Sequence, residues 1–433
     1  MNLSHGIQKQ CIGRLCLGIL LLPLFVGEAS AQQSYNWDQI KNKFEAANPA
    51  LKADANGVDE LKAEEITAYL RPNPQFSLTV DGTQIAPNGG QWHPVYGTFA
   101  VPNFSYLHER EHKRELRLES AQEATRIGGS LHEDLERNLL YSLRSAFVQT
   151  LQAKAVLDLA RADLEYYDKI IEISRARFKD GDLAQIDLDR IELLRVQYES
   201  EIQTAILNLR TQKIALLQLL NDRTPLDQFD VNGRFDFTSD LKPLDDFRQV
   251  ALDARPDLRA AVQGIEQAKT NHQLAIANGS TDPTFGTWYT WNSAVNNPDA
   301  LHLSTLGFSV SIPLRIFDRN QGEKKRTLID IDRNQNLTTV ARAQVFSDVD
   351  SAYEQVQSNI VLLVPYRDKY KDQATRVRDT VTYAYQHGGA SLMDFLNAQS
   401  DYRIVQLAYL QLVGAYLTAA GQLNLAVGRE VIP

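Results

Sequence analysis

The ten-residue stretch Phe178-Lys-Asp-Gly181-Asp-Leu-Ala-Gln-Ile-Asp187 has a counterpart at Tyr385-Gln-His-Gly388-Gly-Ala-Ser-Leu-Met-Asp394. In both, an aromatic residue is followed three positions later by glycine and six positions after that by aspartate. Long helical patterns lie on either side. Glycine can end a helix in a left-handed cap, and the polar residues after it can begin a returning helix. Each stretch therefore predicts the turn of a long helical hairpin.

The spacing of these two turns recurs elsewhere in the chain. The turn glycines lie 207 positions apart, the same offset relates Pro49 to Pro256, and an offset of 209 relates Phe76 to Phe285. Self-similarity at a fixed period indicates repeated units. We therefore expect two tandem copies of one architecture. The expected units are 32–220 and 244–433, with a linker at 221–243 between them.

The segment 1–31 has the pattern of a secretory signal peptide. Basic residues precede an apolar run from Leu15 to Val26, and Ala-Ser-Ala at 29–31 fits a cleavage site. An uncleaved anchor is the alternative, but the run is shorter than the ~20 residues of a spanning helix. Both cysteines, Cys11 and Cys16, lie in this segment. The mature chain therefore has no disulfide or thiol chemistry.

Each half contains two stretches in which apolar and polar residues alternate. In the first half the alternation runs from Phe76 to Val80, and a second strand is expected at 96–101. In the second half the same period of two occupies 285–291 and 306–312. Such alternation predicts strands with one apolar face. We therefore expect one strand hairpin in each unit.

These strands, of about 7 to 11 residues, have the length that crosses a bilayer when a strand is tilted. Trp92, Trp288 and Trp291 fall in or beside them, as an interfacial aromatic belt would. The alternative is a soluble four-stranded sheet that packs on a helix. Four strands cannot close a barrel, and an open edge in lipid would leave backbone groups unsatisfied. Membrane strands would therefore require several chains to share one barrel.

Long stretches with helical periodicity fill most of the remaining chain. About seventy residues of helix span roughly 100 Å, more than a globular core can cover, so we expect coiled-coil packing along the helices. A kink is expected at Pro365, which lacks an N–H for an internal hydrogen bond. The expected helices are 36–70 broken at Pro49, 103–178 interrupted at Gly128-Gly129, 183–220, 319–385 and 392–427.

The sequence offers little support for an enzyme. The formal net charge of -9 argues against a nucleic-acid binder, and no catalytic triad, P-loop or dinucleotide motif occurs in its required context. His108-Glu109-Arg-Glu-His112 is a literal H-E-x-x-H motif, which on a helix could bind zinc. Charged residues surround it, and neither Glu133 nor Glu136 could reach it along a continuous helix. We therefore expect no enzyme, cofactor or metal site.

The order of these parts resembles the TolC-like family of outer-membrane efflux proteins over essentially the whole mature chain. The most specific matches are Pro72-Asn-Pro-Gln-Phe76, Ser311-Ile-Pro-Leu314 and the two turn motifs. The resemblance implies a mixed α/β membrane protein that forms a homotrimer. Four strands from each chain would share one barrel in the outer-membrane lipid, and the helices would continue it as a tunnel across the periplasm. The turns would dock on a periplasmic adaptor (membrane fusion protein) and an inner-membrane pump.

The resemblance also assigns residues to a constriction at the tip. In that family, acidic residues on the helix after the second turn ring the narrowest part of the tunnel. Asp394 matches the first such position, and Asn397 occupies the second. Three copies of Asp394 would attract cations, and like-charge repulsion would raise their proton affinity. The residues expected to dock the adaptor are Gly181, Asp182, Gly388 and Gly389.

A closing network at the tip is implied in the same way. Asp187 and Tyr385 match residues that hold the tip closed in relatives, whereas Ala390 stands where some relatives have the arginine of that network. A weaker or differently built closure is therefore expected. The alternative is that Asp187 and Asp394 are ordinary helix N-terminal residues, which the helix dipole favours.

The function that the resemblance implies is the exit duct of a tripartite efflux system. The alternatives are the outer-membrane exit of a type I protein-secretion system and a soluble periplasmic coiled-coil scaffold without a pore. The Pro-Asn-Pro run and the first turn resemble the heavy-metal (cobalt-zinc-cadmium type) branch more than the multidrug branch. Met393 is the single methionine of the mature chain, so the sequence does not contain a methionine relay for soft metals.

Overall fold

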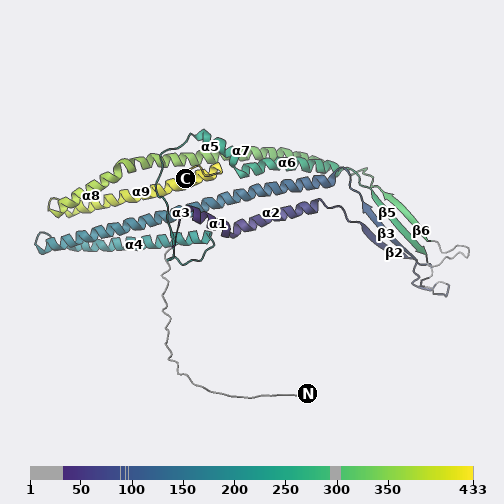
Figure 1. Ribbon diagram of the computed structural model, residues 1–433, viewed down its shortest axis with the longest axis horizontal. Coiled ribbons are helices and arrows are strands. Elements are labelled where there is room, and N and C mark those ends of the chain that lie inside the picture. Colours follow the sequence, from purple (N-terminus) through teal and green to yellow (C-terminus); the bar gives the residue numbers. More distant parts are fainter. Residues whose placement is uncertain (1–32, 88, 93, 96, 293–303, 433) are drawn as a thin grey trace, which may run out of the picture.

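A computed structural model describes residues 33–87, 89–92, 94–95, 97–292 and 304–432. The protein is elongated: long helices lie side by side over most of its length, with a sheet at one end and the helical turns at the other (Figure 1). The expected signal peptide and most of the loop between the second pair of strands lie outside the described residues.

The elements follow a similar order in the two halves of the chain. In each half two helices lead to a pair of strands and then to a long helical hairpin. The division into units at 32–220 and 244–433 stays a prediction from the sequence offset. The first half contains β1 (Gln33–Tyr35), α1 (Trp37–Ala47), α2 (Pro49–Ala68), β2 (Gln75–Asp81), β3 (Phe99–Leu107), α3 (Lys113–Lys179), α4 (Gln185–Leu219) and β4 (Phe229–Val231). The second contains α5 (Leu244–Ala254), α6 (Pro256–Ala277), β5 (Thr284–Asn292), β6 (Thr305–Ser311), α7 (Gln321–Pro365), a π-helix (Tyr366–Tyr370), α8 (Lys371–Gln386) and α9 (Leu392–Val427).

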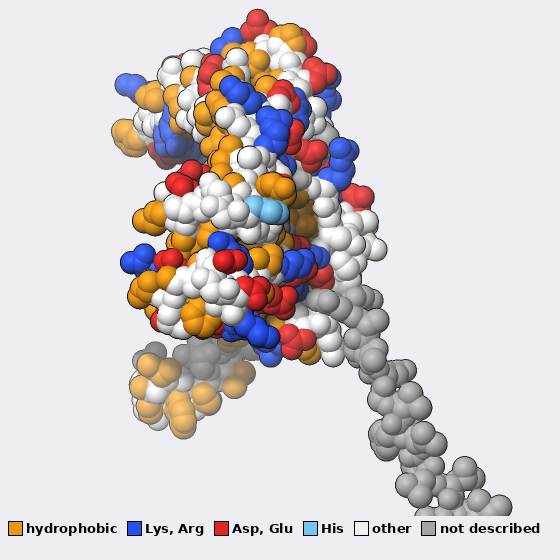
Figure 2. Space-filling model, turned by 90° about the vertical axis from the view of Figure 1, so that its left-hand side faces the viewer, with side chains coloured by type: hydrophobic (Ala, Val, Ile, Leu, Met, Phe, Trp, Pro, Cys, Tyr) orange, Lys and Arg blue, Asp and Glu red, His pale blue; other side chains and the backbone are white. Residues whose placement is uncertain are grey.

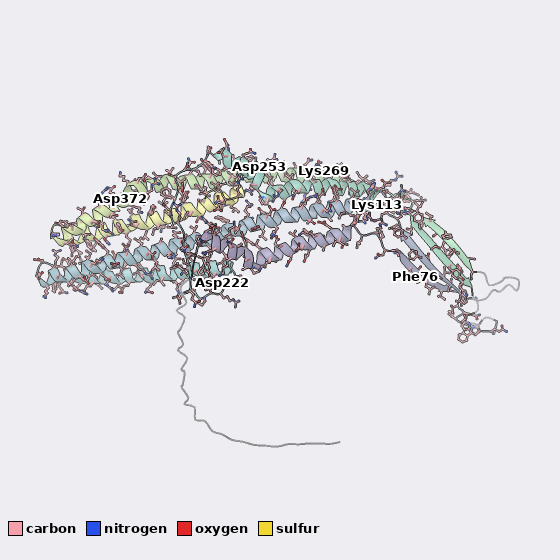
Figure 3. The ribbon with its side chains drawn as sticks, in the orientation of Figure 1. Phe76, Lys113, Asp222, Asp253, Lys269 and Asp372 are labelled. Atoms are coloured by element: carbon pink, nitrogen blue, oxygen red, sulfur yellow. The ribbon has the colours of Figure 1, made fainter. Side chains whose placement is uncertain are left out.

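The four longer strands form one antiparallel sheet in the order β2-β3-β5-β6. The two hairpins are joined through β3 and β5, where Phe104 lies opposite Thr287. Within the described chain, the edge strands β2 and β6 each pair on one side only. Phe76 of β2 is 71% exposed and Phe308 of β6 is 76% exposed, and Figure 3 shows Phe76 on the sheet. The sheet is therefore open, with apolar side chains on its outer strands.

β3 corrects two expectations from the sequence. It runs from Phe99 to Leu107, so the strand does not end at 101 and no helix begins at 103. Pro102 lies inside the strand opposite Leu78 of β2. Toward β5 the described ladder skips Val101 and Pro102, because proline has no N–H to donate. A proline that reads as a helix start in the sequence is thus accommodated within a strand.

The long helices follow their predicted limits more closely, with one correction. α3 is continuous from Lys113 to Lys179, so the interruption expected at Gly128-Gly129 is wrong. Gly128 instead allows α2 to approach, since a Cβ atom there would lie 2.5 Å from Leu61 Cδ1. At Pro365 the expected disturbance is confirmed, because α7 ends there and a π-helix leads into α8. Such a local widening accommodates the missing donor.

Buried side chains gather in three clusters along the helices. Two of them form hydrophobic cores in the middle of the molecule. One lies around Phe44 and Leu216, and the other lies around Phe247 and Leu423. The third lies toward the turns and joins α3 and α4 to α8 and α9. Its buried members are Tyr167, Ile170, Ile171, Ile191, Tyr198, Tyr385 and Phe395.

Among the described helices, α9 alone is long and apolar enough to cross a membrane by length and composition. A buried core helix meets the same test. α9 packs against α7, α8 and α3, and Val413, Tyr416 and Leu423 are buried along it. Helix packing therefore accounts for its apolar composition.

Candidate functional site at the helical tip

Both turns lie at the same end of the molecule (Figure 1). Gly181 follows α3 with a φ of 85°, and Gly388 follows α8 with a φ of 76°. The N–H of Asp182 donates to the carbonyl oxygen of Arg177 at 2.8 Å, and the N–H of Gly389 donates to that of Ala384 at 2.7 Å. These bonds satisfy carbonyls of the last helical turn, as a left-handed cap does. Both stretches therefore form the helical turns that their spacing predicts.

The four residues predicted to dock an adaptor are all solvent-exposed at these turns: Gly181, Asp182, Gly388 and Gly389. Seen from this end, acidic, basic and hydrophobic side chains are interspersed, without a field of one sign (Figure 2). A protein partner that docked here would therefore contact short turns with mixed charged and hydrophobic side chains, and not a surface patch of one charge.

Asp394 begins α9 as part of a capping box. Its Oδ2 accepts hydrogen bonds from the Ser391 hydroxyl at 2.7 Å and from the Ser391 N–H at 3.1 Å, and its own N–H donates to Ser391 Oγ at 3.2 Å. The hydroxyl bond, followed by the backbone bond, lowers the pKa of Asp394. In the single chain this is opposite to the raised proton affinity expected of a ring of three. The ring at Asp394 and at Asn397, which is exposed one turn further along α9, stays a prediction.

Tyr385 is buried at the end of α8, with 2% of its surface exposed. Its ring stacks on Phe395 with 5.1 Å between centroids. Its hydroxyl has no hydrogen-bond partner among the described residues. Asp187 is half-buried in the first turn of α4, and no described hydrogen bond joins it to Tyr385. Within one chain the predicted pair is therefore not formed, and its role in closure stays a prediction.

Arg177, in the last turn of α3, is the tip residue that sequence reasoning missed. Its Nη1 donates to the carbonyl oxygen of Tyr385 at 2.6 Å, and its guanidinium lies 5.1 Å from the centre of the Tyr385 ring. It thus supplies a cation between the two turns, although Ala390 occupies the position where the resemblance leads one to look for it. A basic residue in a last helical turn is common, so the sequence offered only a weak signal.

The H-E-x-x-H sequence does not form the helix that a zinc motif needs. His108 to His112 connect β3 to α3, and Glu111 and His112 have left-handed φ values of 55° and 53°. Glu109 is engaged by Arg117, whose Nη1 lies 2.5 Å from Oε1. Because the two imidazoles do not share a helix face, the motif lacks its metal-binding geometry. Nowhere in the described chain do three His, Cys, Asp or Glu side chains form a metal-binding group.

Comparison with known proteins gives a consistent result. Residues 247–429 match the family described as "Outer membrane efflux protein". The chain is 20% identical to the cobalt-zinc-cadmium resistance protein CzcC of Cupriavidus metallidurans, over 95% of this chain and 94% of that one. Among solved structures, CusC superposes with a TM-score of 0.76 at 18% identity, covering 91% of this chain and 92% of that one. OprN, an outer-membrane channel, gives 0.72 at 14% identity, covering 90% and 89%.

The fold, the family match and the full-length relative agree with one another. The solved structures share the arrangement of long helices and a strand sheet, and the relatives include a cobalt-zinc-cadmium resistance protein and the outer membrane efflux protein BepC of Brucella suis. Residues 247–429 thus match the outer membrane efflux protein family, and the similarity of the whole chain to relatives and channels of this kind indicates a location in the outer membrane, with the helices in the periplasm.

Proposed function

We propose that this chain is one of three identical subunits of an outer-membrane exit duct for an efflux system. The duct receives substrates from a periplasmic adaptor and an inner-membrane pump and releases them outside. The observation that carries the trimer is the open four-stranded sheet, whose outer strands β2 and β6 have no second partner strand among the described residues. In lipid, unpaired backbone groups at β2 and β6 cost several kcal/mol each. Pairing β2 of one copy with β6 of the next removes both edges.

The side chains on the edge strands support a membrane location for the sheet. Phe76, Leu78 and Val80 on β2 and Phe308 and Val310 on β6 are all more than half exposed. In water such a patch would be an aggregation hazard. In a bilayer the same residues face lipid, and their exposure is favourable.

The helices also carry apolar faces that the single chain leaves uncovered. Leu193, Val196 and Leu207 on α4, and Val340 and Val361 on α7, are each more than 60% exposed. Neighbouring copies in a trimer would cover these faces and continue the shared sheet as a helical tunnel. The exposed turns would then form the end that contacts the adaptor.

We further propose that the cargo is a divalent metal ion. The support is the full-length similarity to a protein named for resistance to cobalt, zinc and cadmium. A wide aqueous duct needs little selectivity of its own, so the pump would choose the ion. The chain's own contribution would be an acidic lining at the tip, where Asp394 is exposed.

A growth panel tests this function. A strain that lacks the protein is challenged with cobalt, zinc and cadmium salts, with silver and monovalent copper, and with amphiphilic drugs and dyes. Wild-type protein is expected to restore resistance to the divalent metals, whereas a control version without residues 1–31 is not, because it would not reach the outer membrane. Sensitivity to drugs alone would contradict the metal cargo. A soluble periplasmic monomer would contradict the duct itself.

A further inference from the structure

Asp163 is a buried carboxylate at the place where the two helical hairpins meet. It lies on α3 and is only 3% exposed. Among the described residues, no hydrogen bond or ion pair reaches its side chain. A buried aspartate without a partner is uncommon, because the charged form loses its hydration without compensation. The position therefore calls for a functional explanation.

The cations near Asp163 are engaged by other groups. Arg403 of α9 binds both carboxylate oxygens of Glu201 on α4, at 2.7 and 2.8 Å. Arg378 of α8 pairs with Asp379 at 2.8 Å. Both guanidinium groups lower the pKa of Asp163 through their charge without a direct contact, and the charge of Glu201 raises it.

Aromatic rings pack against both of these arginines, and the Arg403 guanidinium lies 5.5 Å from the ring centre of Tyr198. The Arg378 guanidinium lies 4.6 Å from the ring centre of Tyr166 and 4.0 Å from that of Tyr402. On α4, Tyr198 stacks on Tyr167 with 4.6 Å between centroids. Burial, which Arg403 and Arg378 only partly offset, raises the pKa of Asp163 to about 6. The group thus titrates above the range of a hydrated aspartate.

A groove of about 770 Å³ opens beside this carboxylate between α3, α4 and α9. Its lining is mainly apolar and includes Leu193 and Val196 of α4 and Ile404 of α9, together with Asp163. If α4 and α9 moved apart along this groove, Asp163, which lines it with 3% of its surface exposed, would become more fully hydrated. The charged carboxylate gains hydration in that open arrangement, and the neutral acid gains little.

We propose that Asp163 is a proton switch between the hairpins: its neutral form holds α3 and α4 against α8 and α9, and its ionised form favours their separation. As a regulator of an efflux duct the switch rests on the proposed function. The pH dependence of the packing does not, and can be measured without any transport.

The size of the effect follows from the two environments. A hydrated aspartate titrates at 3.8, and the buried one at about 6. The free-energy cost of burying the ionised carboxylate is absent below the hydrated pKa of 3.8 and grows as pH rises toward the buried pKa of about 6. Above the buried pKa the full cost applies. About two pKa units correspond to a change of roughly 100-fold in the ratio of packed to separated hairpins.

Spin labels test the switch directly in the full mature chain purified in detergent. The mature chain has no cysteine, so Ser200→Cys on α4 and Ile404→Cys on α9, both exposed beside the groove, give one label on each side of the groove. Distances are measured by pulsed EPR from about pH 4 to about pH 8, the range that spans both titrations. The packed population is expected to fall as pH rises.

Two variants separate the switch from a merely structural role. Asp163→Asn removes the titration and is expected to give one packed population at every pH. Glu201→Gln removes the opposing charge and frees Arg403, so the transition is expected to move to lower pH. Asp158→Asn, on the same helix but 64% exposed, is the matched control and should respond as wild type.

Three outcomes overturn the proposal. They are a wild-type distance that does not change with pH, an equal pH response in wild type and Asp163→Asn, and a Glu201→Gln transition at higher pH. If the metal-efflux function failed in the growth panel while these distances behaved as expected, the switch would stand and the cargo would be wrong.

Discussion

Arg177 and Tyr385 join the two helical turns of the tip. The Arg177 guanidinium donates to the Tyr385 carbonyl oxygen at 2.6 Å and lies 5.1 Å from its ring. This is the contact by which the end of α3 holds the end of α8. It crosses from the first hairpin to the second, so a movement that parts the turns must break it.

Replacing Arg177 is therefore expected to loosen the tip. Arg177→Ala loses a charge-assisted hydrogen bond and a cation–π contact, together about 1 to 2 kcal/mol at a half-buried site. The ratio of open to closed channels should rise about tenfold. Single-channel recordings in a planar bilayer measure this ratio from the fraction of time that each channel is open. Arg175→Ala is the control, because Arg175 is exposed and pairs at 2.8 Å with Glu192 inside the first hairpin. Equal effects of the two variants would show that the contact does not hold the tip.

The Tyr385 hydroxyl distinguishes two ways of closing the tip. Within the described chain it has no hydrogen-bond partner, so Tyr385→Phe removes no bond. We expect its conductance to match wild type, while Tyr385→Ala opens the tip by removing the ring that stacks on Phe395. An increase in conductance for Tyr385→Phe would contradict this and would favour a bond to Asp187 of a neighbouring copy.

Asp394 has a capping role in the single chain and a proposed role in a ring. Asp394→Ala removes the carboxylate and the two bonds that it accepts, whereas Ser391→Ala removes the two bonds of the Ser391 hydroxyl and leaves the carboxylate and its backbone bond in place. If the ring exists, the cation preference of the channel falls in Asp394→Ala and persists in Ser391→Ala. Reversal potentials in a salt gradient measure this preference. An unchanged preference in Asp394→Ala would leave only the capping role.

Much of the fold was predictable because it depends on short-range sequence patterns. The glycine of each turn needs a left-handed backbone, and the period of two marks the strands. The end of the strand predicted at 96–101 was wrong because β3 continues through Pro102, and a proline inside a strand is rare. The start of α3 at Lys113 was misplaced for the same reason.

The tip was less predictable because its contacts join residues far apart in the chain. Arg177 and Tyr385, whose carbonyl oxygen it contacts, are 208 positions apart. No sequence pattern around Arg177 predicts this contact. Asp163 looks in the sequence like one more charge on a long helix. Its burial arises only when α8 and α9 pack against α3 and α4.

The junction of sheet and helices depends on one buried ion pair, and its loss should be measurable. Lys113 is 3% exposed, its Nζ lies 2.6 Å from Asp282 Oδ2 and 3.1 Å from the Ser280 carbonyl oxygen, and Figure 3 shows it where the helices meet the sheet. Lys113→Met leaves the half-buried Asp282 with the Arg110 N–H but without its ammonium partner, which costs about 1 to 3 kcal/mol. The midpoint of thermal unfolding should therefore fall. Lys269→Met is the control, because Lys269 is 48% exposed and pairs with Glu266 on its own helix.

The same pair predicts a pH dependence of stability. Burial by itself would raise the pKa of Asp282, but the Lys113 ammonium and the Arg110 N–H lower it overall. The stabilisation is complete above the ordinary aspartate pKa and is lost as pH falls through the lowered one. Wild type should therefore lose this stability in acid, and Lys113→Met should not lose it, because the variant carboxylate has no ammonium partner. Parallel acid-unfolding curves for the two proteins would show that the pair does not stabilise the junction.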